Sequence, residues 1–333
     1  MFLHRLSRVR APEFPGKLAW LQGDAQTLKK LRNKVVLVDF WTYSCANCIR
    51  TQPMLNRWHK LYADKGLVII GVHTPEFSFE KDPKNVELAV TDNGIEYPVV
   101  LDPDYKLWNL YGNQYWPRRY LINLEGNIVY DHIGEGGYAE TEMAIQKALK
   151  DNGAKDLPPV PPDSSAGGAV CYHTTPETYL GFLRGRFGNA QDYLPDAEQV
   201  FADSEKHLDD TPYLYGHWTI KSEYAEHSRK LPTANEYLGI KYSAFAVNLV
   251  MGTSNKRTAV IEVELDGLPL PKDLAGEDVT IARNGKATVT IKDHRMYRLV
   301  KAKMYHRGTL KLKTASGNVQ MFALTFRGCD DGV

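Results

Sequence analysis

The chain has 333 residues, a formal net charge of +1, and 43% hydrophobic and 24% charged residues. This length is typical of two domains, and the near-zero charge gives no reason to expect nucleic acid or a membrane surface as a partner. No segment approaches the ~18 consecutive apolar residues of a membrane span, and the basic residues 1–10 are not followed by the apolar stretch of an export signal. We therefore expect a cytoplasmic protein, or a periplasmic or extracytoplasmic one if a signal or anchor is missing from this chain.

Strands and helices alternate over residues 1–152. The apolar pattern predicts, in order, a short helix at 24–31, a strand at 35–40, a helix at 46–64, a strand at 67–72, a helix at 82–93, a strand at 98–101, a helical turn at 107–111, a hairpin of 119–123 with 127–130, and a helix at 141–149. A strand–helix–strand unit followed by a hairpin and a helix is the order of the thioredoxin fold. The first domain is therefore predicted to be an α/β domain with this fold.

Two cysteines lie where the buried strand at 35–40 gives way to the next helix. Cys45 and Cys48 are separated by two residues, and apolar residues recur at helical spacing after them. At the N-terminus of a helix, the dipole and the free backbone N–H groups favour a thiolate over a thiol. Two thiols one turn apart can exchange with a disulfide, because the first sulfur attacks and the second resolves the mixed disulfide.

A C-x-x-C pair can also be half of a zinc site, which usually needs two further ligands. Cys171 and Cys329 are far away and share no short spacing, and only residues 171–173 offer another cluster of ligands. A strand–C-x-x-C–helix context is typical of redox sites. We therefore expect no metal, and no cofactor other than a redox-active Cys45–Cys48 disulfide.

Residues 153–171 interrupt the pattern with a run rich first in proline and then in serine and glycine, which is typical of a linker between domains. Beyond it, residues 172–333 alternate apolar and polar residues in short segments separated by turn signals. Strands are expected at 242–250, 259–265, 278–281, 287–291, 295–301, 308–314 and 319–326. The second domain is therefore predicted to be an all-β, jelly-roll-like sandwich.

The motif Asp-Phe-Trp-x-x-x-Cys-x-x-Cys at 39–48 resembles that of thioredoxins. The motifs that point more specifically to the TlpA/DipZ type of thiol–disulfide oxidoreductase are Trp-Thr-Tyr-Ser-Cys-Ala-Asn-Cys at 41–48, Gly-Val-His-Thr-Pro-Glu-Phe at 71–77, Tyr-Trp-Pro at 115–117 and Gly-Glu-Gly at 134–136. DipZ-type proteins carry a thioredoxin-like domain followed by a carbohydrate-binding-module-like sandwich, so the resemblance covers nearly the whole chain. The chain differs from DipZ in lacking the membrane-embedded part that delivers electrons. Residues 10–15 resemble instead the thioredoxin-like domain of cytosolic NHL-repeat proteins.

The resemblance implies a task for each residue of the central motif. Cys45, at the start of the helix, is the expected nucleophile, and Cys48, one turn further on, is the resolving thiol. Asp39 resembles the buried acid of thioredoxins that accepts the proton of the inner cysteine, and its apolar neighbours predict a pKa raised by burial. The alternative for Asp39 is a solvated or capping residue at the end of a strand.

The residues expected to bind substrate are Trp41, Trp116 and Pro117. In the family, the proline equivalent to Pro117 is cis and faces the C-x-x-C, where it presents the backbone of Trp116 to an extended substrate peptide. An ordinary turn proline is the alternative. Trp41, Tyr43 and Trp116 are expected to form an apolar lip around the sulfurs, with core packing as the alternative.

Aromatic residues of the second domain are candidates for stacking on a sugar ring, with core packing as the alternative for each. They are Tyr213, Tyr215, Trp218, Tyr224, Tyr237 and Tyr242. Cys171 and Cys329 lie near the two ends of this domain. They form a disulfide if those ends are adjacent, or remain two buried thiols.

These observations predict an enzyme that reduces or isomerises protein disulfides through Cys45 and Cys48. The residues between the two cysteines lack the features of a strong oxidant, so we expect a reductant. Its partners would be protein thiols and disulfides and a reductase or membrane electron donor, without nucleic acid. One alternative is a peroxiredoxin-like thiol peroxidase, since Thr42 lies three residues before Cys45. Another is a carbohydrate-binding or scaffold protein that binds its partner through residues 172–333.

Overall fold

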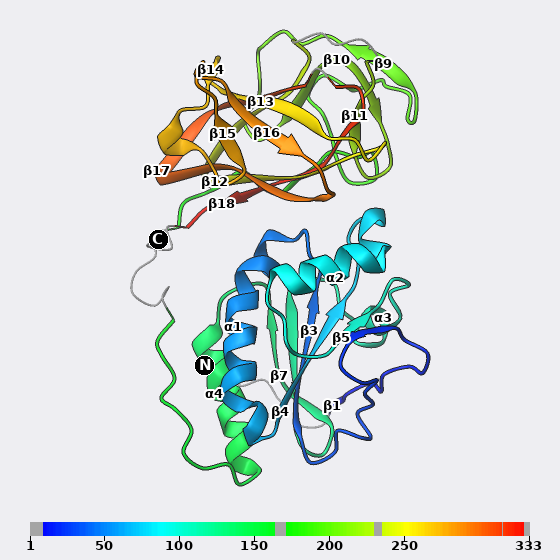
Figure 1. Ribbon diagram of the computed structural model, residues 1–333, viewed down its shortest axis with the longest axis vertical. Helices are drawn as coiled ribbons and strands as arrows, with labels where there is room; N and C mark the ends of the chain where they lie inside the picture. Colours follow the sequence, from blue (N-terminus) through cyan, green and yellow to red (C-terminus); the bar gives the residue numbers. More distant parts are fainter. Residues whose placement is uncertain (1–8, 164–170, 230–234, 315, 330–333) are drawn as a thin grey trace. The chain divides into compact units, whose positions relative to one another are not determined.

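The computed structural model describes residues 9–163, 171–229, 235–314 and 316–329. The chain divides into two compact units, Met1–Gly167 and Gly168–Val333, each described by itself (Figure 1). The division falls within 153–171, the range predicted as a linker; residues 164–170 of it, and the N-terminal residues 1–8, lie outside the described part. In the described part, no helix is long and apolar enough to cross a membrane.

The first unit is a mixed sheet with helices on its faces. Its elements are β1 (Val9–Arg10), β2 (Trp20–Gln22), β3 (Val35–Trp41), α1 (Ala46–Tyr62), η1 (Ala63–Lys65), β4 (Leu67–His73), η2 (Ser78–Lys81), α2 (Pro83–Asp92), β5 (Val99–Leu101), α3 (Lys106–Leu110), β6 (Arg118–Ile122), β7 (Asn127–Ile133) and α4 (Tyr138–Asp151). The strands lie in the order β1-β7-β6-β3-β4-β5-β2. β3, β4 and β5 run parallel, and β6 pairs antiparallel with β3 and β7. The predicted thioredoxin-like fold is confirmed.

β3 is the central strand that leads to the cysteines, and all of its residues are buried. β4 pairs with it on one side and β6 on the other, so a continuous apolar run is the sequence that such a strand requires. Alternate residues enter two cores on opposite faces: Leu37 packs with Trp58 of α1 and Ile145 of α4, and Val38 packs with Trp108 of α3. Figure 1 shows α1 and α4 on the same face of the sheet. Asp39 is in phase with Leu37, so its side chain faces α1.

The helix predicted over 24–31 is wrong, because the structure has a hydrogen-bonded turn there. The N–H groups of Leu28 and Lys29 donate to the carboxylate of Glu13. Leu28 and Leu31 are buried in the core on the α3 side. The apolar spacing that suggested a helix therefore reflects the packing of a single turn.

The second unit is rich in β-sheet. Its elements are β8 (Thr178–Tyr179), β9 (Glu198–Phe201), β10 (Pro212–Ile220), β11 (Ala225–His227), β12 (Tyr237–Thr253), β13 (Ala259–Leu265), β14 (Leu268–Pro269), η4 (Lys272–Leu274), β15 (Val279–Ile281), β16 (Ala287–Ile291), β17 (Arg295–Thr314) and β18 (Val319–Arg327). The strands pair in the order β15-β16-β13-β17-β12-β10-β11-β18-β8, and β12 also pairs with β18. The prediction of a sheet-rich second domain is confirmed, whereas the jelly-roll-like sandwich stays a prediction.

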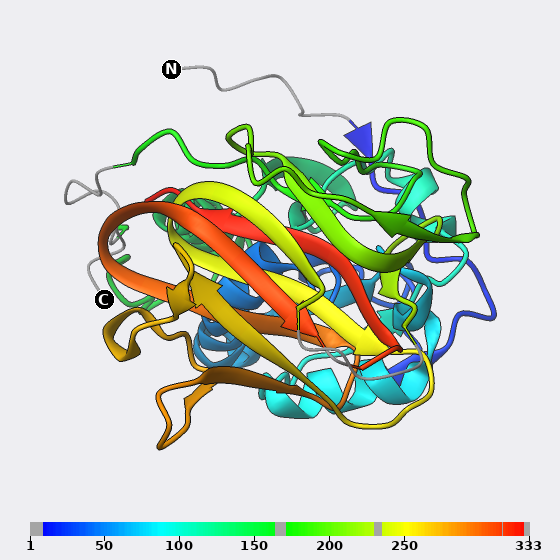
Figure 2. The same ribbon diagram turned by 90° about the horizontal axis from the view of Figure 1, so that it is seen from above.

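Two long strands, β12 and β17, pair along most of their lengths. The strands predicted at 295–301 and 308–314 are both parts of β17. This strand pairs with β12 on both sides of a register shift, which lies between Ala244 and Ala246 of β12. Such irregularities bend a strand and increase its twist. Figure 2 shows β17, in orange, curving strongly. The sequence pattern is broken at this bend, which is why it predicted two strands.

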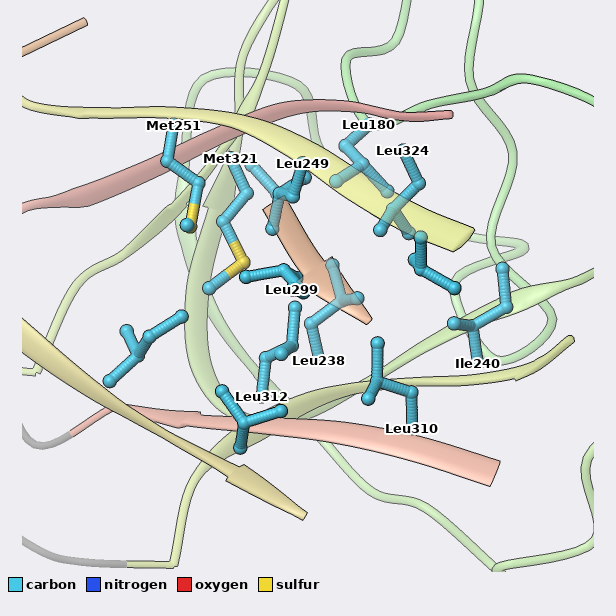
Figure 3. Close-up of a cluster of buried hydrophobic side chains, with 14 of the residues drawn as sticks. Leu180, Leu238, Ile240, Leu249, Met251, Leu299, Leu310, Leu312, Met321 and Leu324 are labelled. Carbon is cyan, nitrogen blue, oxygen red and sulfur yellow. The ribbon is translucent and has the colours of Figure 1, made fainter. Parts of the chain in front are cut away.

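Figure 3 shows the core of the second unit, where side chains of its long strands meet. The buried residues labelled there include Leu238, Ile240, Leu249, Met251, Leu299, Leu310, Leu312, Met321 and Leu324. Burying each side chain of this kind contributes about 1.5–3 kcal/mol relative to leaving it exposed. The second unit therefore has the separate apolar core that a domain requires.

A disulfide joins the two ends of the second unit. Cys171 and Cys329 are bonded across a sequence separation of 158. Beside them, the N–H of Tyr172 donates to the carbonyl of Gly328 at 2.8 Å. Of the two alternatives for these cysteines, the structure has the disulfide, so the first and last described segments of the unit lie side by side.

Candidate active site

Cys45 and Cys48 lie at the start of α1, directly after the loop that leaves β3. Cys45 is the N-cap residue, with an extended backbone (φ −75°, ψ 118°), and the N–H of Cys48 donates to its Sγ at 3.4 Å. Cys45 is half-buried and Cys48 is 1% exposed; both are free thiols. A helix N-terminus and a backbone N–H stabilise negative charge on a sulfur. The accessible sulfur is therefore the one that this geometry can hold as a thiolate.

Behind the accessible sulfur lies a set of buried ionisable groups. Burial raises the pKa of the Cys48 thiol well above its usual range, and the neighbouring Cys45 and Asp39 raise it further. Burial also raises the pKa of Asp39 to about 7, although the Arg119 guanidinium acts to lower it. Neither carboxylate oxygen of Asp39 has a hydrogen-bond partner among the described residues. Asp39 is therefore a buried acid that exchanges its proton near neutral pH, close to a thiol that retains its own.

The loop before β6 faces the accessible sulfur. The Trp116–Pro117 peptide bond is cis, and Sγ of Cys45 lies 3.9 Å from the carbonyl oxygen of Trp116. The half-buried indole of Trp116 donates to the carbonyl of Thr74 at 3.0 Å and packs against Trp108. The structure thus brings Trp116 and Pro117 to the cysteines, and their part in substrate binding stays a prediction.

Trp41 does not form part of a lip around the sulfurs. Its side chain is 1% exposed and packs edge-to-face with His73 in the core on the α1 side. Tyr43 is also buried, and its ring stacks on His73. Burial lowers the pKa of His73 to about 3, so its imidazole is neutral and suited to this packing. Core packing, the alternative for Trp41, is therefore what the structure supports, and its contact with substrate stays a prediction.

Glu80 is a buried carboxylate that the sequence did not indicate. It is 1% exposed, and its Oε1 accepts hydrogen bonds from the N–H (3.1 Å) and the hydroxyl (2.7 Å) of Ser44, the residue before Cys45. Its Oε2 accepts from the N–H groups of Glu76 (2.6 Å) and Phe77 (2.9 Å). This carboxylate therefore ties the loop that carries Cys45 to the loop after β4. No motif or periodicity marks the residue for this role, because Ser44, which it holds, lies 36 residues away in the sequence.

We expect Glu80→Gln to loosen the loop that carries Cys45. The amide nitrogen of glutamine replaces one carboxylate oxygen and cannot accept the hydrogen bonds made there, which costs about 1–3 kcal/mol of stability. The rate at which iodoacetamide alkylates Cys45 should change by several-fold, and the free energy of unfolding of the first unit should fall by about that amount. Both are measured by mass spectrometry, as modification of Cys45 and as hydrogen exchange.

Glu87→Gln is the matched control for this variant, because Glu87 is exposed on α2 and makes the same change of charge. It should leave alkylation and stability unchanged. Equal behaviour of the two variants would show that the Glu80 carboxylate does not position Cys45.

Arg119 is a second buried charged residue of this region that the sequence did not indicate. It lies directly opposite Asp39 in the antiparallel pairing of β3 with β6, and it is 0% exposed. Its Nη2 donates to the carbonyls of Gly136 (2.8 Å) and Gly134 (3.3 Å). The adjacent arginines at 118 and 119 gave no signal of burial in the sequence. Only the pairing of two strands distant in the sequence brings this cation beside Asp39.

The zinc alternative for the C-x-x-C pair finds no support in the described part of the chain. No group of three or more histidine, cysteine, aspartate or glutamate side chains there is arranged to hold a metal ion. The other two cysteines, Cys171 and Cys329, are bonded to each other. Among the residues that the structure describes, the thiols of Cys45 and Cys48 therefore have no set of further ligands arranged for such a site.

Most of the aromatic residues proposed to stack on a sugar are core residues. Trp218 and Tyr242 are 0% and 1% exposed, and Tyr213 and Tyr237 are also buried. Tyr215 is 40% exposed and stacks on Tyr237. Core packing therefore accounts for most of the set, and a sugar platform would have to be built around Tyr215 and the half-buried Tyr224.

Comparison with known proteins gives one family match in each unit. Residues 7–148 match the family described as Redoxin, and residues 175–327 match the family described as Thioredoxin like C-terminal domain. Protein DipZ of Mycobacterium tuberculosis is 35% identical over 279 residues, which are 81% of this chain and 38% of DipZ. This match extends through parts of both units, while the chain spans less than half the length of that relative.

Two shorter similarities each cover less than half of this chain. Thiol-disulfide oxidoreductase ResA of Bacillus thuringiensis is 30% identical over 127 residues, 38% of this chain and 70% of ResA. The crystal structure of the thioredoxin domain of a thiol-disulfide oxidoreductase from Bacteroides vulgatus is 27% identical, with a TM-score of 0.35, over 41% of this chain and 95% of that one. With the family matches and DipZ and ResA as relatives, the chain belongs to the TlpA/DipZ-type, thioredoxin-like thiol–disulfide oxidoreductase family.

Proposed function

We propose that this oxidoreductase reduces the disulfides of other proteins with the dithiol of Cys45 and Cys48. One observation carries the proposal: an accessible sulfur receives a backbone N–H at the start of a helix, and a second, buried thiol lies one turn behind it. Membership of the oxidoreductase family supports the reaction class.

The reaction proceeds in two exchanges. The Cys45 thiolate attacks one sulfur of the client disulfide, so that a mixed disulfide forms and the other client sulfur leaves as a thiolate. Cys48 then attacks the Cys45 sulfur, which closes the Cys45–Cys48 disulfide and releases the second client thiolate. The client gains two electrons, the enzyme dithiol loses two, and the departing thiolates take protons from solvent.

Asp39 supplies the base for the second exchange. Because burial raises the pKa of Cys48, this thiol must lose its proton to a nearby group before it can attack. Asp39 is buried on the same side of β3 and has a pKa of about 7, so its ionised form can accept that proton at neutral pH. The backbone of Trp116, next to Pro117, is the surface on which an extended client segment would lie as an added strand.

Direction, partners and location follow from the same site and from the second unit. The residues between the cysteines, Ala46 and Asn47, carry no positive charge that would stabilise the reduced form, so we propose a reductant that receives electrons from a reductase or a membrane donor. Of the two predicted locations, the Cys171–Cys329 disulfide favours an oxidising compartment outside the cytoplasm. A jelly-roll-like second domain that binds carbohydrate through residues 172–333 stays a prediction.

The test is reduction of insulin by the full chain, with hydrogen peroxide turnover measured in parallel. We expect the protein to accelerate insulin reduction and to consume peroxide slowly, with a Cys45–Cys48 midpoint potential near ~−270 mV. A potential near ~−120 mV would reverse the direction and make the protein an oxidant. Rapid peroxide turnover without insulin reduction would instead establish the peroxidase alternative.

A further inference from the structure

The charge that compensates Asp39 comes from β6, the strand that follows Pro117. Asp39 and Arg119 are directly opposite each other in the antiparallel pair, so their side chains leave the same face of the sheet. Both residues are 0% exposed. Burying a charged group is costly unless an opposite charge or hydrogen bonds compensate it, so two opposite charges buried on neighbouring strands stabilise each other.

The guanidinium is held in place by the loop between β7 and α4. Nη2 of Arg119 donates to the carbonyls of Gly134 and Gly136, and the guanidinium lies over the rings of Trp58 (5.9 Å) and Tyr138 (5.5 Å). Its Nε and Nη1 have no hydrogen-bond partner among the described residues. The same is true of both oxygens of Asp39. Hydrogen bonds from one nitrogen, Nη2, therefore fix the guanidinium. Its other two nitrogens are buried without a hydrogen bond to any described residue.

The charged and titratable groups around this pair come from several elements. Cys48 of α1 and Tyr97, just before β5, respond to the charge of Asp39, and Arg119 of β6 is the cation that acts on Asp39. Around Arg119, Asp39 has the largest effect of any charged group. Weaker effects come from Tyr138 of α4, Tyr130 of β7 and Asp163. His132 of β7 lies directly opposite Arg119 in the β6–β7 pair, and the Arg119 charge helps to lower the pKa of its imidazole, after burial.

We propose that Arg119 is a positioning residue for proton transfer, whose fixed guanidinium keeps the Asp39 carboxyl ionisable so that it can accept the proton of Cys48. The inference rests on the proposed dithiol function, because it assigns Arg119 a task in the same reaction. Burial alone would hold the carboxyl protonated at neutral pH, and a protonated carboxyl cannot accept another proton. The opposite charge offsets part of this effect and leaves the pKa of Asp39 at about 7.

Arg119→Gln and Arg119→Lys separate the charge from the hydrogen bond. Both side chains keep a hydrogen-bond donor, and only lysine carries the cation. We expect the carboxyl ¹³C resonance of Asp39 in the reduced protein to titrate about one pH unit or more higher in Arg119→Gln, and close to the wild-type midpoint in Arg119→Lys. The rate at which Cys48 resolves a preformed mixed disulfide at pH 7 should fall by about fivefold or more in Arg119→Gln, because a smaller fraction of Asp39 is ionised, and recover in Arg119→Lys.

Arg118→Gln is the matched control. Arg118 precedes Arg119 on β6, faces the other side of the sheet, and pairs with Asp131 at 2.7 Å. It should leave the titration and the resolving step unchanged. A titration of Asp39 in Arg119→Gln that matches the wild type would overturn the proposal and leave Arg119 as a support for the loop of Gly134 and Gly136.

Two further outcomes keep the test decisive. If Arg119→Gln does not fold, the double variant Asp39→Asn/Arg119→Gln decides: recovered folding supports the charge pair, and continued failure overturns it.

The titration needs no turnover, so it also separates the two proposals. A shifted titration in a protein that does not reduce insulin would refute the proposed function alone, whereas an unshifted one in an active protein would refute the role of Arg119 alone.

Discussion

Cys45→Ser is expected to lower the rate of insulin reduction on the order of 10³-fold or more, because a serine hydroxyl cannot form the mixed disulfide. Cys48→Ser should fail at the next step. Cys45 still attacks the client, but no second thiol releases it, so the variant and the client remain joined by a disulfide. Single-turnover assays on the reduced variants, followed by mass spectrometry without reductant, distinguish the two results.

The double variant Cys171→Ser/Cys329→Ser is the control, since it removes the other two cysteines of the chain and leaves the dithiol intact. Its rate per folded molecule should remain within about twofold of the wild type. Retained activity in Cys45→Ser, or a Cys48→Ser protein that accumulates no adduct, would be incompatible with the assigned order of attack.

Asp39→Asn is expected to stabilise the first unit at pH 8 and to have little effect at pH 4 or below. In the folded protein the pKa of Asp39 is about 7, compared with an ordinary value of 3.8. Between these values the folded state holds a proton that the unfolded state has lost, so stability falls as pH rises through this window. Above pH 7 the buried carboxylate costs on the order of 4 kcal/mol, which asparagine removes. Denaturant-dependent hydrogen exchange of peptides from β3 measures the difference.

Asp64→Asn makes the same substitution at an exposed position after α1 and should show no such dependence on pH. If Asp39→Asn and the wild type had parallel stability profiles from pH 4 to pH 8, the carboxyl of Asp39 would titrate normally and could not serve as the base for Cys48. Slower release of client by Asp39→Asn, together with its greater stability, is the combination expected of a residue kept for function at a cost to the fold.

The parts of the fold that the sequence predicted are those whose signals are local. The apolar run of β3 and the helical spacing after Cys45 lie within one stretch of residues, so strand, turn and helix could be placed in order. The helix at 24–31 and the division of β17 were wrong because the same local pattern fits a packed turn, or is broken by a bend that only the neighbouring strand explains.

The site divides in the same way. Cys45 and Cys48 carry their own spacing, and Asp39 stands out as a polar residue within an apolar strand. Glu80 and Arg119 could not be found, because a glutamate in a short helix and an arginine in a strand are ordinary at the surface. The hydrogen bond from Ser44 to Glu80 joins residues 36 positions apart in the sequence. The neighbour of Arg119 lies on a strand that is distant in the sequence.

The bond between Cys171 and Cys329 fixes the start and the end of the described part of the second unit at one point. A domain whose two ends are adjacent is suited to domain insertion. It can be inserted into a surface turn of a host protein without separating the two sides of that turn. The exposed turn at Asn284 and Gly285 offers a place to open new termini once the old ones are sealed. The architecture of this chain therefore allows its two halves to be rearranged as modules.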